Sequence, residues 1–581
     1  VSMDDNGAMA AVSAPIGEVE RILQDVPGYV VIANINSPLQ SVIGGATAAV
    51  DAALQAFQSA GFQAVRIPVS HAFHTKIVAP ASGPLREVIA RLGVSSPRIP
   101  VIANVTGQEY PRDPEAIMDM LATQVASPVQ FIRSMQTIYA AGVRVLIESG
   151  PKRVLTALAT DNLKDKEDVT ILSTNHPRKG ALPSLNEALC GLWAAGVIPF
   201  GAQAEQPAMD VAPAAIQLDI SPAVVLDVAK VEAQLAPDAS EIQARIVELV
   251  SQKTGYPAEM LDLDLDLEAD LGVDTVKQAE LFAAVREMYA IPRREDLRLS
   301  DYNTLSKVVG FVSESLAGQR ETTPLPLPPI GLRPNRKESD LEGENAADST
   351  LFSSAPAQPA EPPRGVLFLS AQTAQELKEI LLRAADDIQS GRLPASRIPG
   401  ATELGQPQRL AVDYDTPADL TKKLEKALKM FDSDTPAARQ ALAAQGIFRG
   451  SGQPGKVAFL FPGQGSQYAN MLAELRGLSP VVAETFREAD EVMTPILGRP
   501  LTSLIFVPED KESVARAEEA LRDTAITQPA VLTADVAMLR LLATYGYQPD
   551  MVAGHSLGEY AALVAAGALS FAAALQIVSA R

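Results

Sequence analysis

The sequence predicts an α/β protein that contains one separate all-helical unit. Strand-like and helical patterns alternate through residues 1–200 and again through residues 363–581, which is typical of mixed α/β layers. A Gly-x-Ser-x-Gly sequence at residues 554–558 follows an apolar strand pattern and precedes an Ala- and Leu-rich helical pattern. Residues 239–317 show helical spacing throughout and predict a compact four-helix bundle.

Composition limits the classes of partner. The 581 residues carry a net charge of −21, which argues against nucleic acid or an anionic membrane surface as a partner. The single cysteine, Cys190, lies in an apolar helical pattern and is expected in the core, so no disulfide framework or thiolate metal site is expected. We find no secretory signal and no run of 18 apolar residues, and therefore expect a cytoplasmic protein.

Residues 1–200 begin with short strands and helices in the order βαββαβ, which predicts a ferredoxin-like subdomain over about residues 8–68. The strands are expected at 8–14, 29–35, 41–44 and 64–67, and the helices at 16–25 and 46–60. Further strands, expected at 101–105, 143–148 and 169–172, alternate with helices. This part is typical of half of an α/β layer.

For the middle of the chain, the sequence predicts two linkers with a helical bundle between them. Residues 201–238 form a linker rich in Ala, Pro and Gln, and residues 318–362 a Pro-rich, disordered tether. Between them, helices are expected at 240–255, 273–289 and 305–316. The loop at 261–267 alternates Leu and Asp but lacks the Gly and the terminal Glu of an EF-hand, so we predict a solvated loop without a metal.

The last part of the chain returns to α/β patterns. In residues 363–450, strands at 366–369 and 409–413 each precede a long helix, which predicts a small adaptor domain. Residues 456–461 form an apolar, buried strand that leads into the loop 462–467. Helical patterns then continue up to the Gly-x-Ser-x-Gly sequence.

Ser556, at the centre of that sequence, is a candidate nucleophile. The flanking glycines allow a tight turn that exposes its hydroxyl, and the backbone N–H of Leu557 can stabilise an oxyanion. The five residues alone also fit an ordinary turn between a strand and a helix.

A serine nucleophile needs a base, and the chain offers four histidines. His555 adjoins Ser556, and neighbours at a sharp turn point apart, while the charged sequence around His176 predicts a surface turn. His71 and His74 remain, and from their position alone each is either catalytic or structural.

Four stretches together resemble the acyltransferase domain of fatty-acid and polyketide synthases, which has an α/β-hydrolase-like fold. They are Phe-Pro-Gly-Gln-Gly-Ser-Gln at 461–467, Gly-His-Ser-Leu-Gly-Glu at 554–559, His-Ala-Phe-His at 71–74 and Ser-Gly-Pro-Lys-Arg-Val-Leu at 149–155. The resemblance implies that Ser556 takes malonyl from coenzyme A and that His74 is the base. It also implies an oxyanion hole formed by Gln464 and the Leu557 amide.

The same resemblance places an arginine at the end of the helix after the nucleophile, which here is Arg581. A guanidinium matches a carboxylate with two hydrogen bonds, so it selects a malonyl group over a plain acyl group. In the family, the Phe beside the base closes the α-carbon pocket, so Phe73 favours malonyl over methylmalonyl. We place His555, next to the nucleophile, among the substrate-binding residues as well.

The two acyltransferase parts stand in an unusual order. Residues 1–200 resemble the second half of the domain and residues 456–581 the first half. One interpretation is a fragment of a synthase with two successive acyltransferases, cut inside both, since the chain starts at Val1 and stops inside a helical pattern. Ser556 and His74 then belong to different sites. The other interpretation is a circular permutation in which the two parts close a single site.

Residues 239–317 resemble the acyl carrier domain of synthases that make polyunsaturated fatty acids. The resemblance lies in Leu-Glu-Ala-Asp-Leu-Gly-Val-Asp-Thr-Val-Lys at 267–277. The family has a serine that carries 4′-phosphopantetheine where this chain has Thr275, whose extra methyl hinders attack on coenzyme A. Either Thr275 carries the arm, or the unit is a spacer that bears no acyl group.

We therefore interpret the chain as a segment of a multidomain synthase that transfers malonyl from malonyl-CoA through an acyl-serine to a carrier thiol. The adaptor resembles the linker that follows a ketosynthase, so condensation is expected in other modules. The expected partners are acyl carrier domains, the ketosynthase and other synthase modules, with no metal, nucleic acid or membrane. The alternatives are an α/β serine esterase and a non-catalytic docking segment with a vestigial carrier domain.

Overall fold

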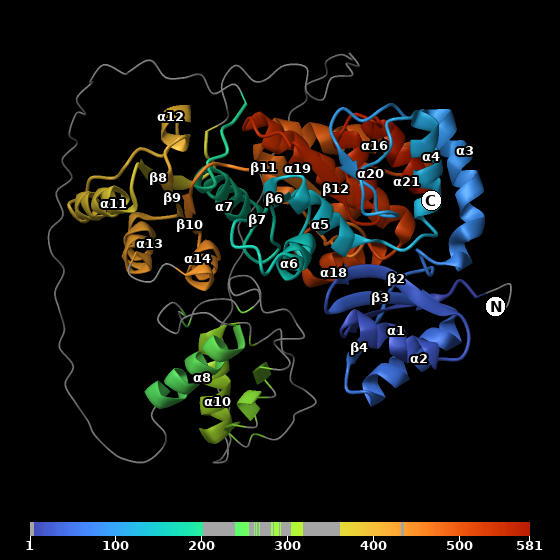
Figure 1. Cartoon of the computed structure of the whole chain (residues 1–581), viewed down its shortest axis with the longest axis horizontal. Coiled ribbons are helices and arrows are strands. Elements are labelled where there is room, and N and C mark those ends of the chain that lie inside the picture. The colour runs from blue at the N-terminus through green and yellow to red at the C-terminus, as the bar shows by residue number, and fades with distance from the viewer. Residues whose placement is uncertain are drawn as a thin grey trace. The chain divides into compact units, whose positions relative to one another are not determined.

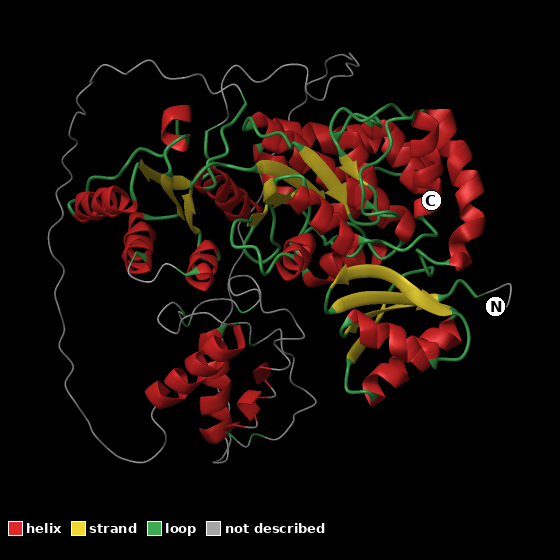
Figure 2. Ribbon diagram, in the orientation of Figure 1, coloured by secondary structure: helices red, strands yellow, loops and turns green. Residues whose placement is uncertain are grey.

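A computed structural model describes residues 5–200, 239–254, 305–317, 361–431 and 435–581, together with isolated positions between 261 and 304. The chain divides into two compact units, which we describe separately. The first unit comprises Val1–Ala202, Ser349–Phe431 and Gly446–Arg581, and the second comprises Gln203–Asp348 and Asp432–Gln445. Figures 1 and 2 show the elements of each unit.

A five-stranded sheet in the order β5-β12-β11-β6-β7 lies at the centre of the first unit. The strands are β5 (Val101–Ile102), β6 (Val143–Glu148), β7 (Thr170–Ser173), β11 (Lys456–Phe461) and β12 (Met551–Gly554), and every pair is parallel. Two segments that are distant in the sequence therefore build one sheet: β12 and β11 of the second segment lie between β5 and β6 of the first.

Apolar side chains from both segments share the core beneath this sheet. One cluster joins Leu146 of β6, Leu460 of β11 and Ala553 of β12 to the buried faces of α5 (Phe131–Ala140) and α6 (Val154–Asn162). The ladder partner of β5 is β12, a strand of the other segment. Neither segment alone provides the neighbours that these strands need, because β-strands require a partner for their backbone N–H and C=O groups.

Helices surround the sheet, and α20 (Gly558–Ala565) packs against β11 and β12. The others are α3 (Ser82–Leu92), α4 (Pro114–Gln124), α7 (Ala181–Ala194), α15 (Ala473–Leu478), α16 (Pro480–Leu497), α17 (Thr502–Ile505), α18 (Lys511–Ala520), α19 (Thr524–Thr544) and α21 (Phe571–Ala580), with a 3₁₀ helix at Lys76–Ala81. By length and composition α19 could cross a membrane, but 83% of its most apolar window is buried inside the protein.

A four-stranded antiparallel sheet forms from β1 (Ala8–Ser13), β2 (Val30–Ser37), β3 (Gln40–Gly45) and β4 (Gln63–Ile67). Its order is β2-β3-β1-β4, and α1 (Ile16–Gln24) and α2 (Thr47–Ser59) pack against it around the buried ring of Phe57. The elements follow the βαββαβ order expected from the sequence. Strand β5 is shorter than expected, because Ala103 already donates its N–H to Gln108 in a turn.

The adaptor is a three-stranded antiparallel sheet in the order β10-β9-β8, formed from β8 (Gly365–Ala371), β9 (Gln408–Tyr414) and β10 (Ile447–Ser451). The sequence predicted β8, β9 and the long helices α11 (Ala374–Gln389) and α13 (Pro417–Met430), but missed β10 and the short α12 (Ala401–Leu404).

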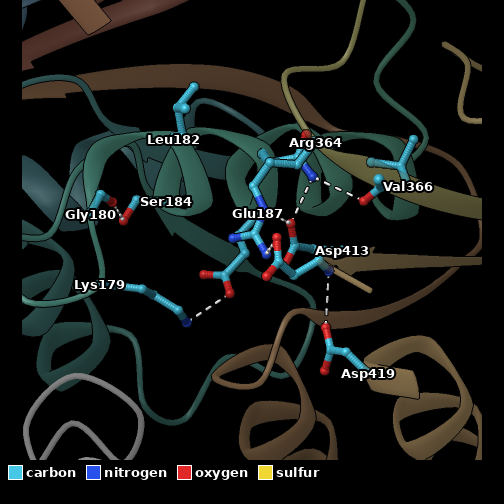
Figure 3. A network of polar contacts seen from close by, with 12 residues as sticks. Lys179, Gly180, Leu182, Ser184, Glu187, Arg364, Val366, Asp413 and Asp419 are labelled. Atoms are coloured by element: carbon cyan, nitrogen blue, oxygen red, sulfur yellow. Dashed lines mark hydrogen bonds and ion pairs between the residues drawn. The ribbon is translucent and has the colours of Figure 1, made fainter. Parts of the chain in front are cut away.

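Helix α7 packs against β9 and β10 and so joins residues 1–200 to the adaptor. Figure 3 shows the polar contacts at this junction. Asp413 is almost fully buried, and it accepts a hydrogen bond from the Asn186 amide at 2.7 Å and pairs with Lys423 at 3.4 Å. Beside it, Lys179 pairs with Glu187 at 2.7 Å.

In the second unit the structure describes α8 (Ala239–Thr254), α10 (Leu305–Ala317) and α14 (Pro436–Ala443). The helices α8 and α10 agree with the expected ranges 240–255 and 305–316 and contact each other. Thr275 and most of the helix expected at 273–289 lie outside the described residues.

Candidate active site

Ser556 lies in the turn between β12 and α20, in a backbone conformation that non-glycine residues rarely adopt. Its φ is +52°, within the left-handed region that is strained for L-residues. The two flanking glycines are required sterically: a Cβ at Gly554 would lie 2.0 Å from the Gly558 carbonyl, and a Cβ at Gly558 would lie 2.0 Å from the Phe461 oxygen. This geometry agrees with the predicted turn that exposes a nucleophile.

His74, on the loop after β4, reaches Ser556 from the other segment of the chain. Its Nε2 lies 2.7 Å from the Ser556 Oγ, and its Nδ1 lies 3.1 Å and 3.0 Å from the backbone oxygens of Gln124 and Ser127. Both oxygens are acceptors only, so we assign the proton to Nδ1, and Nε2 then accepts from the serine hydroxyl. Backbone carbonyls orient the ring in the place where many serine hydrolases use a carboxylate.

Burial lowers the pKa of His74 from 6.5 to about 3, with the charges of Arg581 and His555 contributing in the same direction. His74 is therefore neutral, as a general base must be, at all pH values near neutrality. A lowered pKa means that the base form is lost only when the pH falls well below 6.5.

We therefore expect kcat/KM for acetyl transfer to fall on the acid side of its pH profile only well below pH 6.5, and we call this fall the acid limb. In Arg581→Met the limb should move upward, because one of the charges that lower the pKa of His74 is removed. Acetyl-CoA is the substrate for both proteins, since it has no carboxylate to pair with Arg581. A wild-type limb near pH 6.5, or a downward shift in the variant, would contradict this assignment.

Two backbone amides near Ser556 have no hydrogen-bond acceptor among the described residues. Neither the Gln464 N–H nor the Leu557 N–H donates a hydrogen bond to any described residue. The loop that carries Gln464 lies directly against the turn, since a Cβ at Gly463 would lie 2.4 Å from the His555 oxygen. Unpaired, preorganised amides at this place are what stabilisation of a tetrahedral intermediate requires.

Arg581 follows α21, the second helix after Ser556. The sequence predicted a single helix from Ser556 to Arg581, but α20 ends at Ala565 and a turn precedes α21. The guanidinium lies over the rings of Phe73 and Tyr560, 5.3 Å and 5.7 Å from their centroids. Its Nε is buried without a hydrogen bond, and it forms no ion pair with the described residues.

Arg581 and Phe73 both line a cavity of about 900 Å³. Its wall also includes Asn6, Tyr29, His71 and Asp523. A guanidinium that forms no ion pair with the described residues and faces a cavity is suited to an anionic ligand, because an uncompensated charge that is partly removed from water is costly. Phe73 adjoins His74 in the sequence, and the Gln124 side chain bonds to both the Arg581 guanidinium and the Ser556 backbone oxygen, so a carboxylate held by Arg581 would lie near the serine.

Two buried side-chain amides that the sequence analysis did not select hold the Ser556 backbone. Asn104 accepts a hydrogen bond from the Ser556 N–H at 2.8 Å and donates to the Gly554 oxygen at 2.7 Å. Gln124 donates to the Ser556 oxygen at 2.7 Å. One signal was available for Asn104, which follows β5 at the carboxyl edge of the sheet, where sites in α/β proteins form.

The remaining histidines have other contacts. The His555 Nε2 lies 2.8 Å from the Asn36 Oδ1, and the ring packs edge-on against Phe131. Burial lowers the pKa of His555 to about 4. The prediction of a surface position for His176 was wrong: it is buried, and its Nδ1 accepts from the backbone amides of Arg178 and Lys179. These contacts fold the charged turn around the ring.

The structure brings the two segments of the chain into one site. Ser556, Leu557, Gln464 and Arg581 come from residues 456–581, and His74 and Phe73 from residues 1–200. This is the arrangement that the circular-permutation interpretation requires. The interpretation with two tandem domains had placed Ser556 and His74 in different sites.

Comparison with protein families identifies the family of this chain. The model of the acyl transferase domain matches residues 1–190 and 458–581, more than half of the chain, and the chain belongs to this family. The model of the phosphopantetheine attachment site matches residues 244–312. Its match includes Thr275, which lies outside the described residues.

Individual relatives align with parts of the chain. A polyunsaturated fatty acid synthase protein of Thraustochytrium sp. is 34% identical over 194 residues, which cover 33% of this chain and 7% of that protein. The malonyl CoA-acyl carrier protein transacylase of Bacillus subtilis is 48% identical over 126 residues, 22% of this chain and 36% of that enzyme. The crystal structure of the acyltransferase domain from the second module of the salinomycin polyketide synthase aligns with 33% of this chain and 45% of its own, at 30% identity and a TM-score of 0.30.

Proposed function

We propose that the site transfers a malonyl group from coenzyme A to the phosphopantetheine thiol of an acyl carrier domain, through an acyl-enzyme at Ser556. The observation that carries this proposal is Arg581, whose guanidinium forms no ion pair with the described residues, lines a cavity together with Phe73, and is joined to Ser556 through the Gln124 side chain. An esterase for neutral esters has no use for a cation in its acyl site, whereas a malonyl carboxylate pairs with it.

The transfer proceeds in two half-reactions. In the first, the Ser556 oxygen attacks the thioester carbonyl as His74 Nε2 takes its proton, and the carbonyl oxygen gains negative charge next to the Gln464 and Leu557 amides. The C–S bond then breaks, and His74 returns the proton to the departing sulfur of coenzyme A. In the second, a carrier thiol gives its proton to His74 and attacks the carbonyl carbon of the acyl-serine. The ester C–O bond breaks, and His74 returns the proton to the Ser556 oxygen.

Phe73 defines one wall of the acyl position in this proposal. Its ring lies beside His74 in the sequence and under the Arg581 guanidinium, so a substituent on the α-carbon of the acyl group would meet it. Discrimination against one extra methyl is worth about 1–3 kcal/mol. We therefore assign a preference for malonyl over methylmalonyl, and we place His555 at the edge of the substrate site.

The proposal includes the finer domain assignments and the partners. We assign β1–β4 with α1 and α2 as a ferredoxin-like subdomain and residues 239–317 as a four-helix carrier unit, whose arm would attach at Thr275. The sequence match to a phosphopantetheine attachment site supports the carrier unit. The acceptors are acyl carrier domains of a multidomain synthase, and a ketosynthase in another module uses the malonyl-carrier product.

Covalent labelling tests this function. The full chain, incubated with malonyl-CoA and analysed by intact mass, should gain one malonyl group at Ser556, and a holo-acyl carrier protein should then remove it. Acetyl-CoA should label more slowly, because it makes no ion pair with Arg581. Failure of malonyl-CoA to acylate Ser556 would disprove the proposal.

The two alternatives predict different results. A serine esterase hydrolyses p-nitrophenyl esters with many turnovers and gains nothing from a carboxylate on the acyl group. A docking segment without catalysis gives no adduct with any thioester. Malonyl labelling that is discharged by a carrier thiol faster than by water excludes both.

A further inference from the structure

One buried residue contacts three members of the proposed site at once. Gln124 ends α4 and is fully buried. Its Nε2 donates to the Ser556 backbone oxygen at 2.7 Å, and its Oε1 accepts from the Arg581 Nη2 at 3.2 Å. Its own backbone oxygen accepts from the His74 Nδ1 at 3.1 Å. Gln124 therefore links the nucleophile, the base and the cation through direct hydrogen bonds.

We propose that the Gln124 side chain is a positioning residue that makes the site selective for a diacid acyl group. It fixes the Arg581 guanidinium relative to the strained Ser556 peptide, so that a carboxylate held by Arg581 has its thioester carbonyl at the Ser556 hydroxyl. This inference rests on the malonyl transfer proposed above and adds a residue to it.

The contacts of Arg581 explain why a positioning group is needed. Its side chain is long and has many rotamers, and with no ion pair among the described residues its orientation depends on few contacts. Two of these contacts are with the aromatic faces of Phe73 and Tyr560, and such contacts do not fix the position of the guanidinium within the plane of the ring. The hydrogen bond to the Gln124 Oε1 is the directional contact, and it leaves the remaining N–H groups for a substrate.

The choice of a neutral amide is also significant. A carboxylate at position 124 would form a buried ion pair with Arg581 and compete with the carboxylate of the substrate. It would also lack the N–H that the Ser556 oxygen accepts. An amide meets both needs, since it provides one donor and one acceptor without a charge.

The first experiment compares malonyl-CoA and acetyl-CoA as donors for the wild type and for Gln124→Met in the full chain. Methionine keeps the volume and the backbone oxygen that orients His74, but removes both side-chain hydrogen bonds. We expect the malonyl-to-acetyl ratio of kcat/KM to fall about tenfold or more, since a lost hydrogen bond to a charged group has an effect of this size. Acetyl transfer should fall less.

The matched control is Asn186→Leu, which removes another fully buried side-chain amide at the junction with the adaptor. It should lower thermal stability as Gln124→Met does, yet leave the malonyl-to-acetyl ratio unchanged. An equal loss with both substrates in Gln124→Met, or an unchanged ratio, would overturn the inference. A wild type that takes no malonyl at all would instead refute the proposed function.

Gln124→Glu provides a second test if the methionine variant does not fold. Its carboxylate should pair with Arg581, so malonyl transfer should fall strongly at neutral pH and recover in part as the pH is lowered and the carboxylate is protonated. Acetyl transfer should lack this recovery. A pH profile for malonyl transfer with the same shape as that of the wild type would reject the role of Gln124.

Discussion

Replacing Ser556 with alanine will abolish covalent acylation of the chain and lower acyl transfer by about 10⁴-fold or more, the effect of removing a nucleophile from a site that works as a unit. The reason lies in the geometry of the site. Among the described residues, the hydroxyl that lies within hydrogen-bond distance of the His74 Nε2 is that of Ser556, at 2.7 Å. The effect should be on kcat, since the cavity, Arg581 and Phe73 that bind the substrate are unchanged.

The fold should survive this change. The backbone N–H of residue 556 donates to Asn104, and its backbone oxygen accepts from Gln124. Neither contact involves the hydroxyl. Ser134→Ala is a suitable control, because it also removes a buried serine hydroxyl, here one in α5 that donates to the backbone oxygen of Gln130. It should acylate normally in the same intact-mass measurement. A malonyl adduct on the Ser556→Ala chain would show that another residue is the nucleophile.

The sequence predicted the core elements well where the pattern of burial was regular. The strand expected at 456–461 is β11, whose residues after Lys456 are all buried, and a short, fully apolar run identifies such a strand. Strand β10 was missed because only Ile447 and Phe448 are buried in it, and Arg449 and Gly450 carry no strand signal. Its place is determined by pairing with β9, a tertiary contact.

The site residues also fall into those that the sequence could predict and those that only tertiary contacts determine. Ser556, His74, Gln464 and Arg581 could be selected because they stand in recognisable motifs. Asn104 and Gln124 could not, because their roles depend on contacts with residues 452 and 432 positions away in the sequence. The position of His176 was misjudged for a related reason: the charges around it predicted exposure, but the backbone amides of the same turn enclose the ring.

His74→Ala should be nearly as damaging as the loss of the serine, with transfer reduced by about 10²–10⁴-fold, the usual contribution of a general base. With Ser556 left intact, the chain should still acquire malonyl slowly. The measurement is the rate of the first acylation in a rapid-quench experiment. A rate within a few-fold of the wild type would mean that Ser556 works with a base other than His74.

Mixing the two variants determines whether the site closes within one chain. The two strands from residues 456–581 lie between strands from residues 1–200 in the central sheet, so the same sheet could form within a chain or by exchange of segments between two copies. In the first case a mixture of Ser556→Ala and His74→Ala chains contains no complete site. We expect this outcome, because the structure joins Ser556 and His74 of a single chain.

The variants should therefore be unfolded together, refolded as a mixture and labelled with malonyl-CoA, with each variant refolded alone as the control. Closure within the chain predicts that the mixture labels at the average of the two separate rates. Exchange between copies predicts that about a quarter of the sites combine an intact Ser556 with an intact His74 and acylate rapidly. A rapid phase of that size would overturn closure within the chain while leaving the roles of both residues intact.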